Sequence, residues 1–156
     1  MKKLILTVGI SGSGKSKYVN TLNKDEYTIV SPDNIRYFIT GDISNQTKNK
    51  EVFEIVNESI ILALNAGIKN VVLDATNLKS TERRALLNIL KLKVINKFEP
   101  CAKVFYCTPE IAKSRIKSDI TNNINRSNVP DSAIDRQFKN YINDINKLES
   151  DGYTLI

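Results

Sequence analysis

The chain of 156 residues contains no histidine. This absence excludes histidine as a general acid, as a general base and as a metal ligand, so any base must be a carboxylate, a lysine or a water molecule. No apolar run approaches the roughly 18 residues that a membrane span requires. Only about five apolar residues follow Met1-Lys2-Lys3, which is too few for the core of a secretion signal. We therefore expect a cytoplasmic protein without a membrane partner.

Cysteine is scarce as well. The two cysteines, Cys101 and Cys107, fall in one predicted strand, where an offset of six residues separates them by roughly 20 Å. This distance is far beyond the reach of a disulfide. We expect both to be small, buried, apolar residues in a reducing compartment, and we expect no metal site built from cysteine.

The composition is that of one globular domain. Apolar residues make up 41% of the chain and charged residues 26%, and the net charge is +6. The basic excess suits a polyanionic partner such as nucleic acid, but charge alone does not separate this interpretation from a basic composition without a function. Neither repeats nor a linker divide the chain, so we predict a single domain over 1–156.

The most informative motif follows the apolar run 4–8. Residues 9–16 read G-I-S-G-S-G-K-S, which matches the phosphate-binding pattern G-x-x-x-x-G-K-S/T between a strand and a helix. The glycines allow the backbone to wrap a phosphate chain, and the helix directs its positive end to the same place. We expect Lys15 to contact the β- and γ-phosphates and Ser16 to contact Mg²⁺. The residues expected to bind ATP here are Gly9, Gly12, Ser13, Gly14, Lys15 and Ser16.

Short apolar strands alternate with helical stretches, which predicts an α/β fold: a P-loop NTPase three-layer sandwich whose parallel sheet of about five strands has helices on both faces. The predicted strands cover about 3–8, 27–31, 71–73, 102–106 and the tail 153–156. The predicted helices cover about 15–23, 34–38, 50–66, 80–94, a stretch from 110 and 130–148. We expect a loop over 41–49, an N-cap at Ser80 or Thr81, and a small mobile lid over about 118–129.

Residues just past each strand are candidates for the site, because ligands bind at the carboxyl ends of the strands in an open parallel sheet. After the second predicted strand, Asp33 is a candidate general base for an acceptor hydroxyl, with a helix N-cap as its alternative role. Arg36 lies three residues further on the same face, where its guanidinium can hold a substrate phosphate. The alternative for Arg36 is an ordinary surface arginine.

A second polar group follows the third predicted strand. Asp74 ends this strand, and it is a candidate to contact the substrate, to act on Mg²⁺ through water, to hold the P-loop hydroxyl or to have a buried structural role. Thr76 and Asn77 offer neutral hydrogen-bonding groups to a substrate. Arg83 and Arg84 open the next helix, where cations oppose the helix dipole. We therefore predict a substrate role for Arg83, with salt bridges as the alternative.

Two arginines, Arg115 and Arg126, flank or lie in the predicted lid. Negative charge builds on the phosphoryl group during its transfer, and an arginine that lid closure brings in stabilises this charge. We therefore expect either residue to bind ATP, with a solvated lid arginine as the alternative for each.

These motifs, in this order, resemble the kinase domain of bacteriophage polynucleotide 5′-hydroxyl kinases and related small P-loop kinases. The matching pieces are residues 1–7 before the P-loop, Asp33-x-x-Arg36, residues 74–78 with 82–84, and Val129-Pro130 after a basic lid. The resemblance implies that Asp33 is the general base on a 5′-hydroxyl and that Arg36 holds the neighbouring phosphate. It also implies that the lid arginine on the donor phosphates is Arg126 rather than Arg115, and that Lys15 completes the catalytic set.

The sequence therefore predicts an ATP- and Mg²⁺-dependent kinase that phosphorylates the 5′-hydroxyl of DNA or RNA. An alternative is a P-loop kinase whose acceptor is a nucleoside, an aminoacyl-tRNA or another small hydroxyl metabolite. A third interpretation is a regulatory module that binds ATP or GTP, and the arginines of the lid disfavour it. The preference for ATP over GTP is implied by the resemblance alone, and the oligomeric state stays open.

Overall fold

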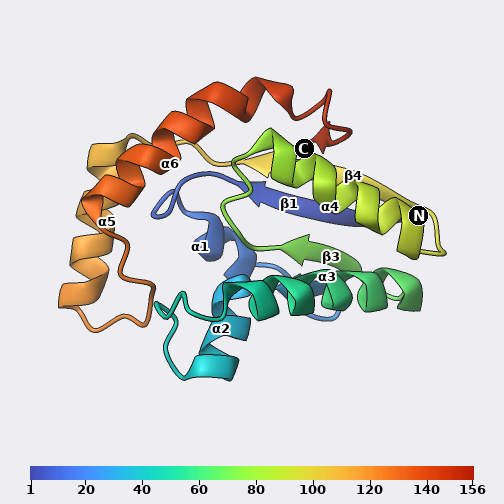
Figure 1. Ribbon diagram of the computed structural model, residues 1–156, viewed down its shortest axis with the longest axis horizontal. Helices are drawn as coiled ribbons and strands as arrows, with labels where there is room; N and C mark the ends of the chain where they lie inside the picture. The colour runs from blue at the N-terminus through green and yellow to red at the C-terminus, as the bar shows by residue number, and fades with distance from the viewer.

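The polypeptide folds around one parallel β-sheet, and the computed structural model describes all residues from 1 to 156. The strands are β1 (Lys2–Val8), β2 (Tyr27–Val30), β3 (Asn70–Leu73), β4 (Phe98–Val104) and β5 (Thr154–Leu155). They lie side by side in the order β2-β3-β1-β4-β5, and every neighbouring pair is parallel. The predicted α/β fold with a five-stranded parallel sheet is confirmed (Figure 1).

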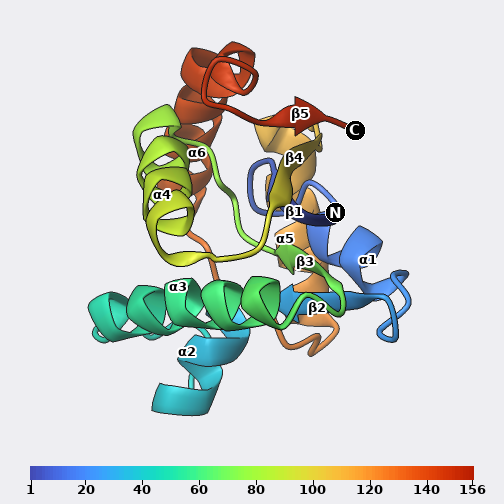
Figure 2. The ribbon, with the colours of Figure 1, turned by 90° about the vertical axis from the view of Figure 1, so that its right-hand side faces the viewer.

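Helices cover both faces of the sheet. They are α1 (Lys15–Asn20), α2 (Pro32–Thr40), α3 (Asn49–Ala66), α4 (Ser80–Lys93), α5 (Pro109–Thr121) and α6 (Asp131–Asp144), followed by the short 3₁₀ helix η1 (Ile145–Lys147). α3 and α4 lie on one face and α1 on the other (Figure 2), whereas α5 lies beyond the carboxyl ends of the strands (Figure 1). None of these helices combines the length and the apolar character that a membrane crossing requires.

Alternate residues of β1 enter opposite layers of the core, because side chains alternate along a strand. Leu4, Leu6 and Val8 belong to the cluster that packs against α3 and α4. Ile5 belongs to the cluster on the other face, with Val19 of α1. A strand that is buried on both faces leaves only its ends for polar chemistry, so the site is expected where the strands meet their following loops.

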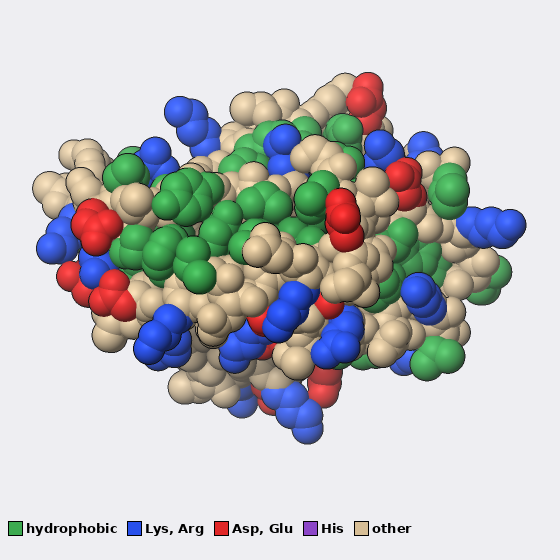
Figure 3. All heavy atoms as spheres, turned by 90° about the horizontal axis from the view of Figure 1, so that it is seen from above, with side chains coloured by type: hydrophobic (Ala, Val, Ile, Leu, Met, Phe, Trp, Pro, Cys, Tyr) green, Lys and Arg blue, Asp and Glu red, His purple; other side chains and the backbone are tan.

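The sheet ends at β5, which pairs two residues with β4 and confirms the predicted edge strand. An edge this short leaves few unpaired backbone groups. Seen from the side of α6, apolar side chains gather over the middle of this face (Figure 3). Ile142 of α6 and the C-terminal residues Leu155 and Ile156 are about half exposed.

The fourth strand begins earlier than the sequence predicts. β4 covers Phe98–Val104 instead of 102–106, because Pro100 is unusual inside a strand and hides its first half from the pattern. Cys107 therefore follows the strand that holds Cys101, and the prediction that they share a strand is wrong. Both thiols are free and buried, as expected, and burial raises the pKa of each.

Other predicted boundaries shift as well, and α6 ends at Asp144 instead of 148, with η1 after it. α1 ends at Asn20, before the predicted 23. α5 continues to Thr121, so the first four residues of the predicted lid, 118–121, are helical. The remainder of the predicted lid contains no helix or strand and leads into α6.

A buried hydrogen-bond network joins the start of α4 to the C-terminal tail. Arg83 is 1% exposed, and its Nε and Nη2 lie 2.9 and 2.8 Å from Oδ2 of Asp151. Its other N–H groups donate to the carbonyl oxygens of Asn77, Leu78 and Asp144. No donor of the guanidinium is left for a substrate, so the predicted substrate role of Arg83 is wrong and its role is structural.

The same network changes how α4 begins. The Ser80 hydroxyl donates to Oδ1 of Asp151 at 2.6 Å, and Lys79 occupies the N-cap position without a side-chain hydrogen bond. The prediction that Ser80 or Thr81 caps the helix is therefore wrong. A carboxylate from α6 accepts a hydrogen bond from the start of α4 instead, because the Ser80 N–H donates to Oδ2 of Asp144 at 2.9 Å.

Candidate active site at the P-loop

The P-loop joins β1 to α1 at the carboxyl edge of the sheet. The Gly9 N–H donates to the carbonyl oxygen of Thr76 at 3.1 Å, which ties the P-loop to the loop after β3. Gly12 and Gly14 have φ angles of 81° and 101°, values that residues with a side chain rarely adopt. Gly14 is also the N-cap of α1. The glycines thus form the tight turn that the motif predicts.

Lys15 begins α1 and turns its ammonium group into the loop. The residue is 8% exposed, and its Nζ donates to the carbonyl oxygen of Ile10 at 2.7 Å, with Ser13 Oγ 3.4 Å away. Burial lowers the pKa of Lys15 to about 8, and the charge of Asp74 acts in the opposite direction. Lys15 is therefore a desolvated cation that an anionic phosphate group would stabilise.

Replacing Lys15 with methionine should stabilise the protein at pH 7 by about 3 kcal/mol, because it removes a buried charge. Between pH 8 and 10.5 the unfolded chain binds more protons at this position than the folded chain, so the stability of the unaltered protein rises with pH. The advantage of the methionine variant should shrink over this window. Thermal unfolding of both proteins at pH 7 and pH 9.5 measures this difference in stability.

The matched control for this prediction is Lys17→Met, since Lys17 is exposed in the same helix. This variant should change the melting temperature little at either pH. A Lys15→Met protein that melts below the unaltered protein at pH 7, or an advantage that does not depend on pH, would contradict the desolvation of Lys15.

Ser16 and Asp74 meet where β1 and β3 end. The Ser16 hydroxyl donates to Oδ2 of Asp74 at 3.1 Å, which is one of the roles predicted for Asp74. Burial raises the pKa of Asp74, while the hydrogen bond from Ser16 and the charge of Lys15 oppose this shift. No three His, Cys, Asp or Glu residues gather to hold a metal by themselves. A hydroxyl and one carboxylate still fit Mg²⁺, because this ion is commonly bound by few protein oxygens together with substrate phosphates.

A second carboxylate lies at the start of α2, after β2. The Ser31 side chain accepts the N–H of Asn34 and caps this helix. The alternative role of Asp33 as the N-cap is therefore excluded. The side chain of Asp33 is 48% exposed, so it combines access to solvent with a place at the carboxyl edge of the sheet.

Arg36 is a buried partner of Asp33 rather than a surface arginine. Its side chain is 6% exposed, and Nη1 lies 2.6 Å from Oδ1 of Asp33. Nε and Nη2 donate to Oδ1 of Asn49 at 3.3 and 3.1 Å. Asn49 was not predicted, because it falls in the polar stretch 41–49 that shows no periodic pattern. These contacts hold the guanidinium rigidly beside the Asp33 carboxylate.

Asn77 has a structural contact that its predicted substrate role did not include. Its φ is 47°, and its Nδ2 donates to the carbonyl oxygen of Thr7 at 2.8 Å, which joins the loop after β3 to β1. The neighbouring Thr76 accepts the Gly9 N–H through its backbone and remains partly exposed. Substrate contacts by Thr76 and Asn77 stay predictions.

Both predicted lid arginines lie beside the P-loop. Arg126 pairs with Asp119 at 2.7 Å, and its buried Nε has no hydrogen-bond partner. Burial is the main cause of the lowered pKa of Lys15, and the positive charge of Arg126 lowers this pKa further, so the two cations interact. Arg115 donates from Nη1 to the carbonyl oxygen of Gly12 at 3.0 Å. An unpartnered guanidinium N–H beside a phosphate loop fits an anionic ligand.

A glycine-rich loop with a buried lysine, a serine–carboxylate pair and two nearby arginines, set on a parallel sheet, defines a P-loop protein with the kinase fold. Residues 4–142 match the AAA domain family, and the chain belongs to this family.

Comparisons with individual proteins give two kinds of relative. The chain is 33% identical over 93 residues, 51% of its length, to a protein of Autographa californica nuclear polyhedrosis virus whose name combines polynucleotide kinase and RNA ligase. It is 36% identical over 109 residues, 58% of its length, to the adenylate kinase of Wolinella succinogenes. The chain spans 13% of the viral protein and 55% of the adenylate kinase.

The fold comparison extends over nearly the whole chain. A chain in the structure of the Pnkp1/Rnl/Hen1 RNA repair complex superposes with a TM-score of 0.76 and 25% identity. The match covers 94% of this protein and 46% of that chain. The resemblance to polynucleotide kinases that the motifs indicate is confirmed at the level of family and fold.

Proposed function

We propose that this protein transfers the γ-phosphoryl group of ATP to the 5′-hydroxyl of a DNA or RNA strand. The observation that carries the proposal is the half-exposed carboxylate of Asp33 at the carboxyl edge of the sheet. The negative charge of Asp33 raises the pKa of both Lys15 and Asp74, as the smallest of the causes that act on each, so Asp33 lies on the side of the sheet where the P-loop is. A carboxylate at this place is suited to an acceptor that must lose a proton.

The nature of the acceptor follows from this carboxylate. A phosphate acceptor is already anionic at neutral pH and needs positive charge rather than a base, whereas a hydroxyl carries a proton that must leave as the new bond forms. Arg36 is bound to Asp33 and Asn49, and it holds the carboxylate in one orientation. The pair therefore supports a hydroxyl acceptor, with a phosphate of the same strand close to the guanidinium.

In the proposed reaction the acceptor oxygen bonds to the γ-phosphorus, and the bond from this phosphorus to the oxygen bridging to the β-phosphate breaks. Asp33 takes the hydroxyl proton, and ADP leaves with the bridging oxygen. Lys15 and Arg126 balance the negative charge of the donor phosphates. Mg²⁺, held by Ser16 together with the nucleotide, would neutralise further charge on these phosphates.

Similarity to known proteins supports a polynucleotide acceptor first and a small acceptor second. The viral relative and the RNA repair complex carry polynucleotide kinase or RNA repair in their names. The 36% identity to an adenylate kinase favours, as a second candidate, a kinase for a nucleotide, a nucleoside or another small acceptor. The two candidates share the P-loop chemistry and differ only in the acceptor.

Transfer of labelled γ-phosphate from ATP in the presence of Mg²⁺ tests the proposal. The acceptors are a 5′-hydroxyl oligonucleotide, as DNA and as RNA, the same strand with a 5′-phosphate, and adenylate and a nucleoside as small acceptors. We expect label on the 5′-hydroxyl strand and none on the 5′-phosphorylated strand. Label on adenylate or a nucleoside but on no strand would replace the proposal with the second candidate. Intact ATP binding without label on any acceptor would overturn both.

A further inference from the structure

The first turns of α3 border the acceptor side and carry an aromatic residue. Phe53 follows Asn49 by four residues, so the two side chains lie on the same face of the helix. Asn49 accepts hydrogen bonds from Arg36, which in turn pairs with Asp33. Phe53 therefore lies one helical turn away from the group that is proposed to hold the acceptor.

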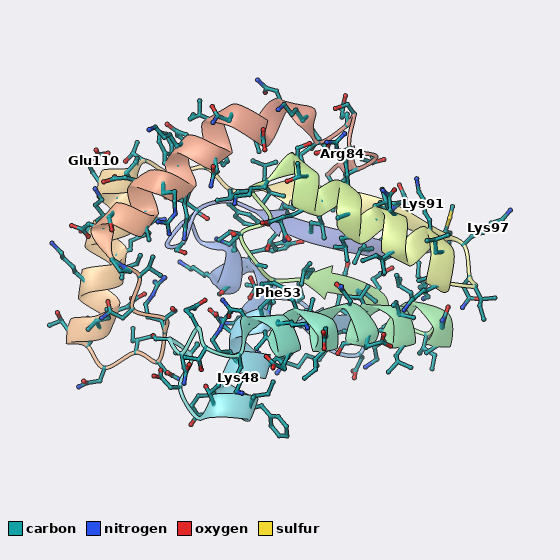
Figure 4. All side chains as sticks on the ribbon, viewed as in Figure 1. Lys48, Phe53, Arg84, Lys91, Lys97 and Glu110 are labelled. Atoms are coloured by element: carbon teal, nitrogen blue, oxygen red, sulfur yellow. The ribbon has the colours of Figure 1, made fainter.

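The exposure of Phe53 does not match its place on the helix. It precedes Val56, Ile60 and Leu64 by 3, 7 and 11 residues, which places it in line with side chains that are 0 to 2% exposed in the core. Phe53 itself is 47% exposed. Figure 4 shows it on the upper edge of α3, toward the middle of the molecule, whereas Lys48 lies below, beside α2. An inward position that stays half open indicates that the core ends here and the site begins.

Two further observations concern the same end of α3. Lys48 and Lys50 are exposed at its N-terminus, where a cation opposes the helix dipole and an anion would be favourable. Nearby, the Asn128 N–H donates to Oγ of Ser44 at 3.0 Å, which joins the loop before α6 to the loop between α2 and α3. This end of α3 therefore combines a half-exposed aromatic side chain with exposed positive charge, and the loop that leads into it is hydrogen-bonded to the loop before α6.

We propose that Phe53 is the stacking platform for the nucleobase of the 5′-terminal nucleotide of the acceptor strand. This inference rests on the proposed function and adds the group that recognises the base. Every base has a π-face, so stacking on an aromatic side chain binds strands of any sequence. A sugar or another acceptor without an aromatic ring gains nothing from such a platform, which directs the site toward nucleic acid ends.

Steady-state kinetics of Phe53→Ala test this platform. The KM for a 5′-hydroxyl oligonucleotide should rise about ten-fold or more, with the KM for ATP unchanged. Phe53→Leu keeps the apolar volume and lacks the π-face, so it should behave like the alanine variant, whereas a packing role would be rescued by leucine. The matched control is Phe38→Ala, because Phe38 is 89% exposed on α2 and should alter neither KM.

A change in the substrate isolates the base itself. A strand whose 5′-terminal nucleotide lacks its base should have a raised KM with the unaltered protein, and Phe53→Ala should add little to this loss. If the two losses simply multiply, Phe53 and the terminal base do not interact, and the platform is overturned.

Direct binding separates the platform from the proposed reaction. The chain contains no tryptophan, so Phe53→Trp introduces a single indole, which can be excited selectively over the six tyrosines. Its emission should be quenched by a 5′-hydroxyl oligonucleotide without ATP, while Phe38→Trp should not respond. Quenching by a strand that the unaltered protein does not phosphorylate would overturn the kinase proposal and keep the platform. Phosphorylation with an unchanged KM in Phe53→Ala and no quenching of Phe53→Trp would keep the kinase proposal and overturn the platform.

Discussion

Replacing Asp33 with asparagine should lower the turnover number for phosphoryl transfer by about 10²–10⁴-fold. The carboxylate is the group proposed to take the acceptor proton, and an amide cannot do so. Asparagine keeps an oxygen that accepts a hydrogen bond from Arg36, so the arginine is not left without a partner. The dissociation constant of ATP should stay unchanged, because Asp33 belongs to the acceptor side.

The control is the same substitution at the other end of β2. Asp25 is exposed just before this strand, at the amino edge of the sheet, and Asp25→Asn changes the net charge of the protein equally. It should retain the full turnover number. A near-normal rate in Asp33→Asn, measured with saturating ATP and acceptor, would refute the role of Asp33 as the base.

Replacing Asp151 with alanine should destabilise the fold by about 3–5 kcal/mol. Arg83 is 1% exposed, and Asp151 is the only carboxylate that pairs with its guanidinium within salt-bridge distance. The variant would leave this charge buried without a counter-charge, and it would also remove the acceptor of the Ser80 hydroxyl. Thermal unfolding should show a melting temperature lower by roughly 10 °C.

Two variants make this second prediction specific. Glu149→Ala removes an exposed acidic residue two positions earlier and should change the melting temperature little. The double variant Arg83→Met with Asp151→Leu replaces the ion pair by apolar side chains, and it should recover much of the loss, because no unpaired charge remains. If the melting temperature of Asp151→Ala equals that of the unaltered protein, the hydrogen bonds of Asp151 to Ser80 and Arg83 do not hold the C-terminal tail to α4.

Much of the donor side of the site follows from local rules. The motif over 9–16 predicts the loop, because glycine is the residue that readily adopts positive φ angles. The structure has such angles at Gly12 and Gly14, and Lys15 begins the following helix. The strand that precedes it is recognisable because a parallel strand is apolar on both faces. Strand ends in a parallel sheet share one edge, so placing Asp33 and Asp74 near the P-loop required no coordinates.

Pairings between distant residues could not be predicted in this way. Arg83 and Asp151 are 68 residues apart, and the pattern around each is that of an ordinary helix start and an ordinary turn. Nothing local distinguishes an arginine that binds a substrate from one that is buried against a carboxylate. The contact between Arg36 and Asn49 is similar, because Asn49 is the last residue of the stretch 41–49, which has no periodic pattern.

Backbone conformation and hydrophobic periodicity depend on near neighbours, and for this protein they already specify a parallel α/β sheet with a nucleotide loop at its carboxyl edge. The partner of a polar side chain depends on which elements pack together, and this choice is made by the whole core. Tertiary packing therefore decided that Asp33 is not the N-cap of α2 and that Arg36 is buried beside it. It also decided that Arg83 has a structural role. Phe53 is a similar case. The sequence places it on the same helix face as core residues of α3, and only the packing of α3 against the sheet shows that its side chain is half exposed.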